Sequence, residues 1–280
     1  MEFKKIMKLI YFIVLFQFSY CFSKMINIPK NPFVYDLGVK IVKSKTRNDS
    51  LTICCHGYGH NNQIVDVVKS FNAIKGNLVG FNFPDYNIKS DADHSKCSYG
   101  TINEILPLLF LLKFYICEQK FSKVNLYGFS AGGGAIINAL GILNKNLYES
   151  ELKNIGILEQ QRKQILNVLQ KGIIILDCPL KSVNEIIAFR GESKELKALA
   201  ANFNANKLNP IDNIDLLSGL KLNIILNLQN PDDVLSNRDD ALFTDKLKKT
   251  NKGKTQLIFS SDIGHTSYHP KLWDYYKKYY

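Results

Sequence analysis

The sequence predicts an α/β protein with a mostly parallel central sheet and helices on both faces. From about residue 51 onward, short apolar runs alternate with longer stretches that have helical spacing. The apolar runs are continuous and do not alternate with polar residues, which is typical of strands buried on both faces. Strand–helix alternation of this kind implies right-handed crossovers between parallel strands.

The expected elements follow the chain in a regular order. Residues 33–44 are predicted to form an opening strand or hairpin, followed by a polar turn. Six further strands are predicted at residues 51–55, 78–83, 124–127, 173–177, 222–228 and 256–259. Seven helices are predicted at residues 63–74, 101–118, 135–143, 151–170, 183–189, 238–249 and 270–279.

The first residues resemble a secretory signal peptide. Lysines precede an apolar segment at residues 9–18, and the small residues Cys21 and Ser23 stand at the −3 and −1 positions of a cut before Lys24. An uncleaved anchor and a lipoprotein signal are the alternatives, although a membrane span needs roughly 20 apolar residues. We therefore expect residues 1–23 to direct export, to the cell envelope (the periplasm in a bacterium) or outside the cell.

Residues 24–280 are expected to form a single domain. The 280-residue chain is 46% hydrophobic and 22% charged, an ordinary globular composition, and no linker divides it. The segments at 145–171 and 181–221 exceed what a minimal sheet needs, and each is a candidate lid. For residues 151–170 the alternative is a surface helix with one face toward the core.

Charge and cysteine content exclude several function classes. The net charge of +11 comes from lysines spread along the chain without an arginine-rich or basic–aromatic stripe, so nucleic-acid binding is not expected. Signal cleavage would leave five cysteines, an odd number, in positions typical of buried thiols. Cys54 and Cys55 are adjacent in a predicted strand, so their side chains should point to opposite faces. No metal-ligand spacing is present, and neither a metal nor an organic cofactor is expected.

One short motif carries the strongest chemical signal. Gly128-Phe-Ser-Ala-Gly132 lies between a predicted strand and a predicted helix, which is the G-x-S-x-G pattern of a nucleophile elbow. Side chains at Gly128 and Gly132 would collide with the neighbouring strand and helix. Such a strained turn exposes the serine hydroxyl, so Ser130 is the candidate nucleophile.

A serine nucleophile needs a base and an acid that orients the base. His265 is the preferred base because it follows the last predicted strand, at the edge where open α/β sheets hold their sites; His269 is the second choice. Asp232 is the preferred acid because it follows the preceding strand. Asp233 is the alternative acid, and Asp177 is a third candidate.

The oxyanion of an acyl-transfer intermediate needs backbone donors. The N–H of Ala131 directly follows the candidate nucleophile. A second donor is expected in the His-Gly-Tyr-Gly turn at residues 56–59, where glycines let the backbone approach a substrate, and we choose the N–H of Tyr58. His56 is expected to be a structural histidine.

The order of these motifs resembles that of the α/β-hydrolase superfamily. HGYG at 56–59, GFSAG at 128–132, Asp232 and GH at 264–265 match its Ser, acid, His order, and the resemblance covers about residues 51–280. The segments at 173–182 and 210–215 look like the esterase and serine-aminopeptidase-like branch. Two features depart from the family pattern: Asn223 stands where a proline often opens the acid strand, and the usual glycine is missing from residues 226–230.

The resemblance implies the α/β-hydrolase fold and hydrolysis of an ester, thioester or amide through an acyl-enzyme on Ser130. We expect an exported carboxylesterase or lipase-like enzyme that acts on a small-molecule or lipid-like acyl substrate. It would contact a membrane only through its signal segment or an uncleaved anchor. The alternatives are a peptidase or amidase, an acyltransferase, and an inactive hydrolase-fold binding protein.

Overall fold

A computed structural model describes most of the chain after its first 25 residues. The described residues are 26–33, 35–44, 50–74, 76–84, 98–190, 194–230, 232–261, 264–266 and 270–278. The predicted signal segment, residues 1–23, lies outside them, as does His269. Among the described residues, no helix is both long and apolar enough to span a bilayer.

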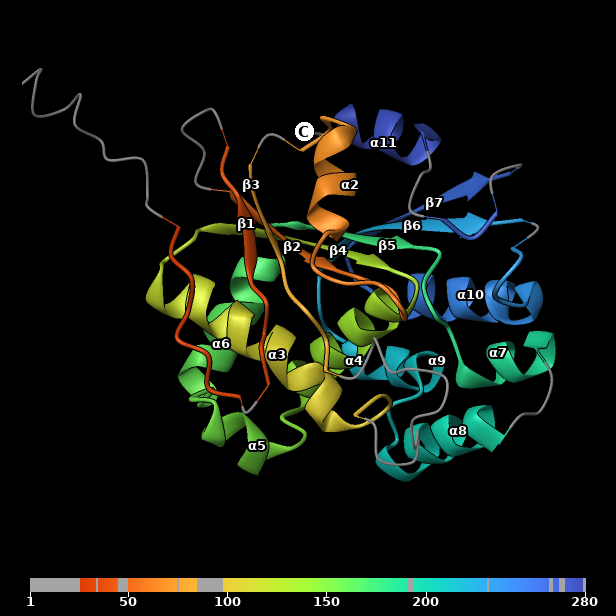
Figure 1. The fold of residues 1–280 in the computed structure, drawn as a ribbon, viewed down its shortest axis with the longest axis horizontal. Coiled ribbons are helices and arrows are strands. Elements are labelled where there is room, and N and C mark those ends of the chain that lie inside the picture. Colours follow the sequence, from red (N-terminus) through yellow and green to blue (C-terminus); the bar gives the residue numbers. More distant parts are fainter. Residues whose placement is uncertain are drawn as a thin grey trace, which may run out of the picture.

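The centre of the molecule is a seven-stranded sheet with strand order β1-β3-β2-β4-β5-β6-β7 (Figure 1). Only β1 runs antiparallel to its neighbour, so the prediction of a mostly parallel sheet is confirmed. The strands are β1 (Lys40–Val42), β2 (Ser50–Cys55), β3 (Asn77–Gly80), β4 (Lys123–Phe129), β5 (Ile173–Asp177), β6 (Asn223–Gln229) and β7 (Lys254–Ser260).

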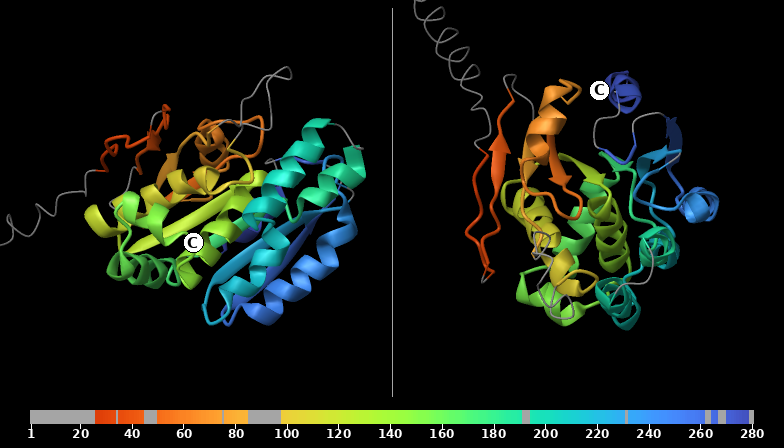
Figure 2. Two further views of the ribbon diagram at one scale, coloured as in Figure 1. Left: turned by 90° about the horizontal axis from the view of Figure 1, so that it is seen from below. Right: turned by 45° about the vertical axis from the view of Figure 1, so that its right-hand side comes forward.

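Helices cover both faces of the sheet (Figures 1 and 2). One face carries α2 (Ile64–Ser70) and α11 (Pro270–Lys277). The other carries α3 (Ile102–Lys113), α4 (Ala131–Lys145), α6 (Glu159–Leu169) and α10 (Asp240–Thr250). Each face has its own hydrophobic core, and the adjacent Cys55 and Cys54 belong to the two different cores, as their alternation predicts.

The predicted helix at residues 151–170 is wrong as a single element. The chain forms α5 (Glu149–Asn154) and then α6, with Gly156 between them at φ +77°. This left-handed backbone ends the first helix and turns the chain, and glycine adopts it without steric cost. Periodicity alone suggested continuity because apolar side chains of both helices reach the same core.

Several shorter elements also differ from the expectation. The helix predicted at residues 101–118 is α3 followed by the π-helical turn η2 (Phe114–Glu118). The loosely helical segment 181–221 contains α7 (Val183–Arg190), α8 (Lys194–Asn206), α9 (Pro210–Asn213) and the 3₁₀ turn η3 (Ile214–Leu217), and another 3₁₀ turn, η4 (Asn237–Asp239), precedes α10. The edge strand β7 is partly exposed and so departs from the expected burial on both faces.

The connections create a crevice at the carboxyl edge of the sheet. The loop after β2 leads to α2 on one face, whereas the turn after β4 leads to α4 on the other face. Ligands of open α/β sheets bind where the connections that leave two neighbouring strands turn to opposite sides. This point lies between the ends of β2 and β4, which are hydrogen-bonded neighbours.

Candidate active site

Ser130 stands on a strained turn between β4 and α4. Its φ of +52° and ψ of −120° lie outside the regions that residues with a side chain normally adopt. An added Cβ at Gly128 would come within 2.8 Å of the Gly132 carbonyl, and one at Gly132 within 2.4 Å of the Cys55 carbonyl. The predicted collisions at both glycines are therefore confirmed, and the tight turn depends on their missing side chains.

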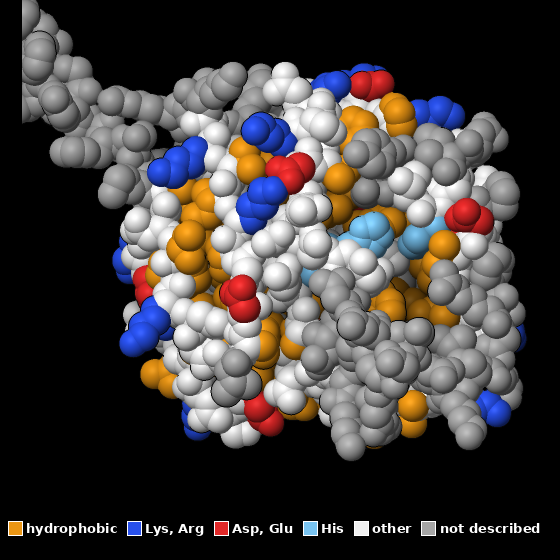
Figure 3. Space-filling model, viewed as in Figure 1, with side chains coloured by type: hydrophobic (Ala, Val, Ile, Leu, Met, Phe, Trp, Pro, Cys, Tyr) orange, Lys and Arg blue, Asp and Glu red, His pale blue; other side chains and the backbone are white. Residues whose placement is uncertain are grey.

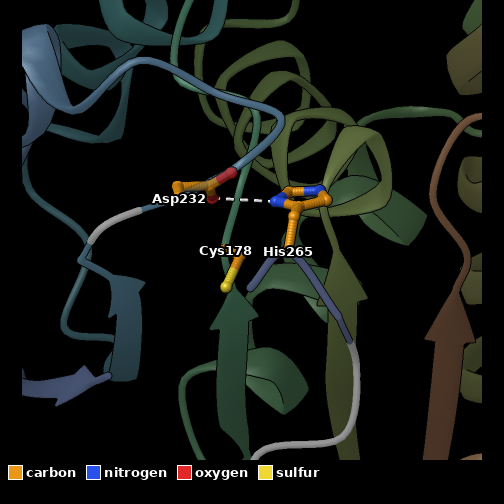
Figure 4. Close-up of side chains that lie close together, drawn as sticks. All are labelled: Cys178, Asp232 and His265. Carbon is orange, nitrogen blue, oxygen red and sulfur yellow. Dashed lines mark hydrogen bonds and ion pairs between the residues drawn. The ribbon is translucent and has the colours of Figure 1, made fainter. Parts of the chain in front are cut away.

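Three side chains from distant parts of the chain form a continuous hydrogen-bonded relay. The Oγ of Ser130 lies 2.9 Å from Nε2 of His265. Nδ1 of the same ring lies 2.8 Å from Oδ2 of Asp232 (Figure 4). If Nδ1 carries the proton, Nε2 is free to accept the serine proton. The carboxyl ends of β4, β6 and β7 bring these residues together, because all three strands run in one direction.

The neighbouring aspartates contact different parts of His265. Asp232 faces the imidazole, whereas Asp233 accepts a hydrogen bond from the backbone N–H of His265. The second carboxylate oxygen of Asp232 accepts the N–H groups of Val234 and Leu235, each at 2.8 Å. These bonds fix the turn after β6. Asp232 thus orients the imidazole ring of His265, and Asp233 holds the main chain of the same residue.

The environment of Asp232 favours its ionised form. Burial on its own would raise the pKa of this carboxyl. The hydrogen bond and charge of the His265 ring, together with the N–H groups of Leu235 and Val234, outweigh that effect and lower the pKa below its ordinary value. The carboxylate therefore stays negative at neutral pH and can stabilise an imidazolium.

The two residues expected to supply oxyanion donors belong to segments next to Ser130. Ala131 is the first residue of α4, where backbone N–H groups have no partner within the helix. The loop that carries Tyr58 touches the elbow, since a Cβ on Gly57 would lie 3.1 Å from the Cβ of Ser130.

His56 holds this loop in place. Its Nε2 accepts the N–H of Phe83 at 3.0 Å, and its Nδ1 donates to the Gly57 carbonyl at 2.8 Å. Burial lowers the pKa of His56 to about 4, so the ring is neutral at pH 7. These contacts make it a structural histidine.

A buried polar network lies beneath the relay. The carboxylate of Asp177, which is fully buried, accepts hydrogen bonds from the hydroxyl of Tyr127 and the amide of Asn227, each at 2.8 Å. The hydroxyl of Ser260 donates to the side-chain oxygen of the same Asn227 at 2.8 Å. In addition, the Asp177 carbonyl accepts the N–H of Ser130 at 2.9 Å. The network thus joins the ends of β4, β5, β6 and β7 under the nucleophile.

Cys178 adjoins the relay and forms the one compact set of potential metal ligands found among the described residues. One ligand atom each from Cys178, Asp232 and His265 lies within 4.8 Å of the others. However, the carboxylate and the imidazole are bonded to each other, and burial raises the pKa of the Cys178 thiol well above its usual range. In Figure 4 the sulfur points away from the hydrogen-bonded pair. This donor set fits a hydrogen-bonded relay better than a metal site.

Two hollows meet at His265. The first, which we call the apolar pocket, has a volume of about 250 Å³; Ser130, Ala131, Leu180 and Leu235 are among its lining residues. The second, which we call the polar pocket, has a volume of about 300 Å³ and is lined partly by Asn61, Gln63 and Thr266. His60, Phe129 and His265 line both. Figure 3 shows histidine side chains gathered beside hydrophobic ones on this face.

The apolar pocket includes residues that sequence reasoning did not identify. Tyr99 precedes α3, Ile186 lies on α7 and Leu199 on α8. The last two belong to the segment 181–221, whereas no described residue of 145–171 lines either pocket. A lid movement for either segment stays a prediction. The only sequence signal for these lining residues is that the 181–221 segment is longer than a sheet connection requires.

No protein-family model and no curated protein sequence matches the chain. Solved structures resemble it in fold but share few identical residues with it. Est1E from Butyrivibrio proteoclasticus, solved with bound ferulic acid, is 15% identical with a TM-score of 0.56, over 87% of this chain and 93% of that one. A thermophilic esterase from Thermogutta terrifontis, with butyrate bound, is 13% identical with a TM-score of 0.59, over 89% and 90%.

A lipase/esterase from Lactobacillus plantarum is 12% identical with a TM-score of 0.57, over 86% of this chain and 91% of that one. The likeness to these three structures covers 86 to 89% of this chain. Together with the mostly parallel strand order and the elbow between β4 and α4, it shows that this chain has the α/β-hydrolase fold.

Proposed function

We propose that this protein is a serine hydrolase that cleaves carboxylic esters through an acyl-enzyme on Ser130. The observation that carries the proposal is the relay from Asp232 through His265 to Ser130, with distances of 2.8 and 2.9 Å. Each distance is that of a good hydrogen bond, and the base and nucleophile need this contact for proton transfer. The relay opens into the apolar pocket, where an acyl group can bind.

In the first step, the Ser130 oxygen attacks the ester carbonyl carbon while its proton passes to Nε2 of His265. The negative charge that develops on the carbonyl oxygen is stabilised by the N–H groups of Ala131 and Tyr58. The negative Asp232 stabilises the imidazolium that forms. When the intermediate collapses, the bond to the leaving oxygen breaks, and that oxygen takes the proton from Nε2.

The second step releases the acid. A water molecule gives a proton to Nε2 of His265 as its oxygen attacks the acyl carbon. Collapse of this second intermediate breaks the bond to Ser130, whose oxygen recovers the proton. The relay thus returns to its starting state, and its protein groups suffice for both half-reactions.

Similar structures support an ester as the substrate. The three structures compared above are an esterase with butyrate bound, a lipase/esterase and a protein with ferulic acid bound. Identities of 12 to 15% leave the substrate to be tested directly. The pattern favours hydrolysis of esters over the peptidase and acyltransferase alternatives.

The test is covalent labelling with a fluorophosphonate probe, followed by mapping of the modified residue, and turnover of p-nitrophenyl butyrate. Ser130 should carry the label, and Ser130→Ala should lower turnover by roughly three to six decades if the relay acts as a unit. Ser150→Ala, an exposed serine on α5, is the matched control. Wild-type turnover in Ser130→Ala would reject the mechanism. A complete absence of fluorophosphonate labelling in the wild-type protein would also reject it and would favour the inactive binding protein.

We also propose that residues 1–23 direct export. The lysines followed by a short apolar segment and small residues support this reading. Expression of the full chain with N-terminal sequencing of the exported form should find Lys24 first. An intact N-terminus on protein retained inside the cell would contradict it.

A further inference from the structure

The two pockets share His60, Phe129 and His265 but differ in their other lining residues. Only the apolar pocket includes Ser130 and Ala131 in its lining, so the reacting carbonyl and its acyl group belong there. The polar pocket includes His265 and Thr266 but neither of those two residues. Because His265 gives its proton to the leaving oxygen, the alcohol part of an ester is directed toward the polar pocket.

The apolar pocket is small and lined mainly by aliphatic and aromatic side chains. Its walls include Leu180, Leu235, Leu199 and the rings of Tyr58 and Tyr99, whose centroids are 5.1 Å apart. A cavity of about 150 Å³ holds benzene, so each carbon needs about 25 Å³. A volume of about 250 Å³ therefore accepts about ten carbon atoms. A short acyl chain or a single aromatic ring fits this pocket, whereas a long fatty acyl chain exceeds it.

The polar pocket offers neutral hydrogen-bonding groups. His60, Asn61, Gln63 and Thr266 each supply a donor and an acceptor. None of the described residues that line it is Lys, Arg, Asp or Glu. Partial burial and the charge of His265 lower the pKa of His60, which favours its neutral form. Hydroxyl groups match these four side chains, and the apolar Ile64, Val67 and Phe129, which also line the pocket, can face the carbon atoms of a ring.

The volume of the polar pocket indicates the size of the group that it can surround. About 300 Å³ accepts about twelve non-hydrogen atoms by the same measure, which is the size of a hexose. Gln63 is exposed and its side chain does not cap α2, so its amide can turn toward a ligand.

We infer that the substrate is an ester between a compact apolar acid and a hydroxylated alcohol about the size of a single sugar ring. This inference rests on the proposed ester hydrolysis at Ser130. It also assigns the acid to the apolar pocket and the alcohol to the polar pocket. His60 and Gln63 then become residues that determine specificity for the alcohol.

The acyl side is tested with p-nitrophenyl acetate, butyrate, benzoate, dodecanoate and palmitate. Butyrate or benzoate should exceed palmitate in kcat/KM by at least about a hundredfold, because each methylene that does not fit costs binding. Leu199→Ala should enlarge the pocket and raise the dodecanoate-to-butyrate ratio, and Ile186→Phe should lower it. Leu242→Ala, an exposed leucine on α10, is the matched control. A preference for palmitate would overturn the inference.

The alcohol side is tested with two butyrate esters of the same shape, one of glucose at its 6-hydroxyl and one of cyclohexylmethanol. The sugar ester should be at least about tenfold better in kcat/KM. Gln63→Leu should reduce this preference about three- to tenfold, the effect of one neutral hydrogen bond. Gln160→Leu, an exposed glutamine on α6, should keep the wild-type preference.

The outcomes separate the two proposals. Equal or better hydrolysis of the cyclohexylmethyl ester, or a preference that Gln63→Leu does not change, would overturn the substrate inference while ester hydrolysis stands. Absence of hydrolysis for every ester, with no fluorophosphonate label on Ser130, would overturn the proposed function itself.

Discussion

The carboxylate of Asp233 accepts the backbone N–H of His265, while the imidazole ring of His265 is hydrogen-bonded to the neighbouring Asp232. Gly264 favours this contact, because a Cβ there would lie 3.0 Å from an Asp233 oxygen, and its φ of +75° is one that side-chain-bearing residues rarely adopt. Adjacent aspartates therefore divide two tasks, with one carboxylate on the main chain and one on the imidazole.

This division predicts unequal effects of the two aspartates on turnover. Asp232→Asn should lower kcat by about four decades, because an amide neither fixes the proton on Nδ1 nor stabilises the imidazolium. Asp233→Asn keeps an oxygen acceptor for the His265 N–H, so its kcat should fall by about tenfold at most. Steady-state kinetics on p-nitrophenyl butyrate will measure both. A larger loss in Asp233→Asn would reverse the assignment of the two roles.

The lowered pKa of Asp232 predicts a contribution to stability that depends on pH. The folded state binds a proton at this carboxyl more weakly than the unfolded state does. Its contribution is therefore fully present above the ordinary aspartate pKa of about 3.9 and is lost as pH falls through the lower folded value. Urea unfolding between about pH 3 and 6 should show a shallower loss of stability toward acid in Asp232→Asn than in the wild type.

The control for this pH series is Asp245→Asn, an exposed aspartate on α10. It should retain the wild-type slope of stability against pH in this range. Identical slopes for Asp232→Asn and the wild type would show that the relay does not lower the pKa of that carboxyl.

Asp177 is predicted to matter for stability although it takes no part in the chemistry. In Asp177→Asn, the new NH₂ group must face either the Tyr127 hydroxyl or the Asn227 amide, and both are donors. A buried donor left without an acceptor costs about 1–3 kcal/mol. The midpoint of urea unfolding should fall accordingly.

Asp215→Asn is the matched control, because that exposed carboxylate pairs with Lys246 at 3.3 Å on the surface. Loss of such a surface pair should change the free energy of unfolding by at most about 1 kcal/mol. Equal effects of the two substitutions would mean that the buried network beneath Ser130 contributes no more to the free energy of unfolding than a surface ion pair does.

The close packing at the elbow predicts a strong effect of Gly132→Ala. The added methyl would meet backbone oxygens of Cys55 and His56 at 2.4 and 2.7 Å, so the loop that carries Tyr58 must move away. We expect kcat/KM to fall at least about tenfold, because small displacements of catalytic groups cost about that much or more. Turnover and circular dichroism of the folded variant will measure it.

Gly219→Ala serves as the comparison, since its Cβ would meet nothing within 4 Å and only its φ of +91° is unfavourable. That backbone cost, about 1–2 kcal/mol, should lower stability and leave turnover near the wild-type level. Normal turnover in a folded Gly132→Ala protein would contradict the tight approach of the two loops.

The sequence predicted six of the seven strands within a few residues, because each is a short continuous apolar run bounded by polar turns. It failed at residues 151–170, where both short helices bury the same kind of side chain and a four-residue turn at 155–158, with Gly156 at positive φ, separates them. Local pattern does not show such a turn, since a glycine in a helical pattern is tolerated at modest cost.

By itself the sequence determined the fold class and the elbow at Ser130. Burial on both faces produces continuous apolar runs, and the close packing of the elbow requires glycines at fixed positions around the serine. Only the tertiary structure decided which of Asp232 and Asp233 meets the imidazole, since the N–H groups that orient the first carboxylate are fixed by the folded turn. It also decided the pocket walls at Leu199 and Tyr99, because residues a hundred positions apart line one pocket only once the chain has folded.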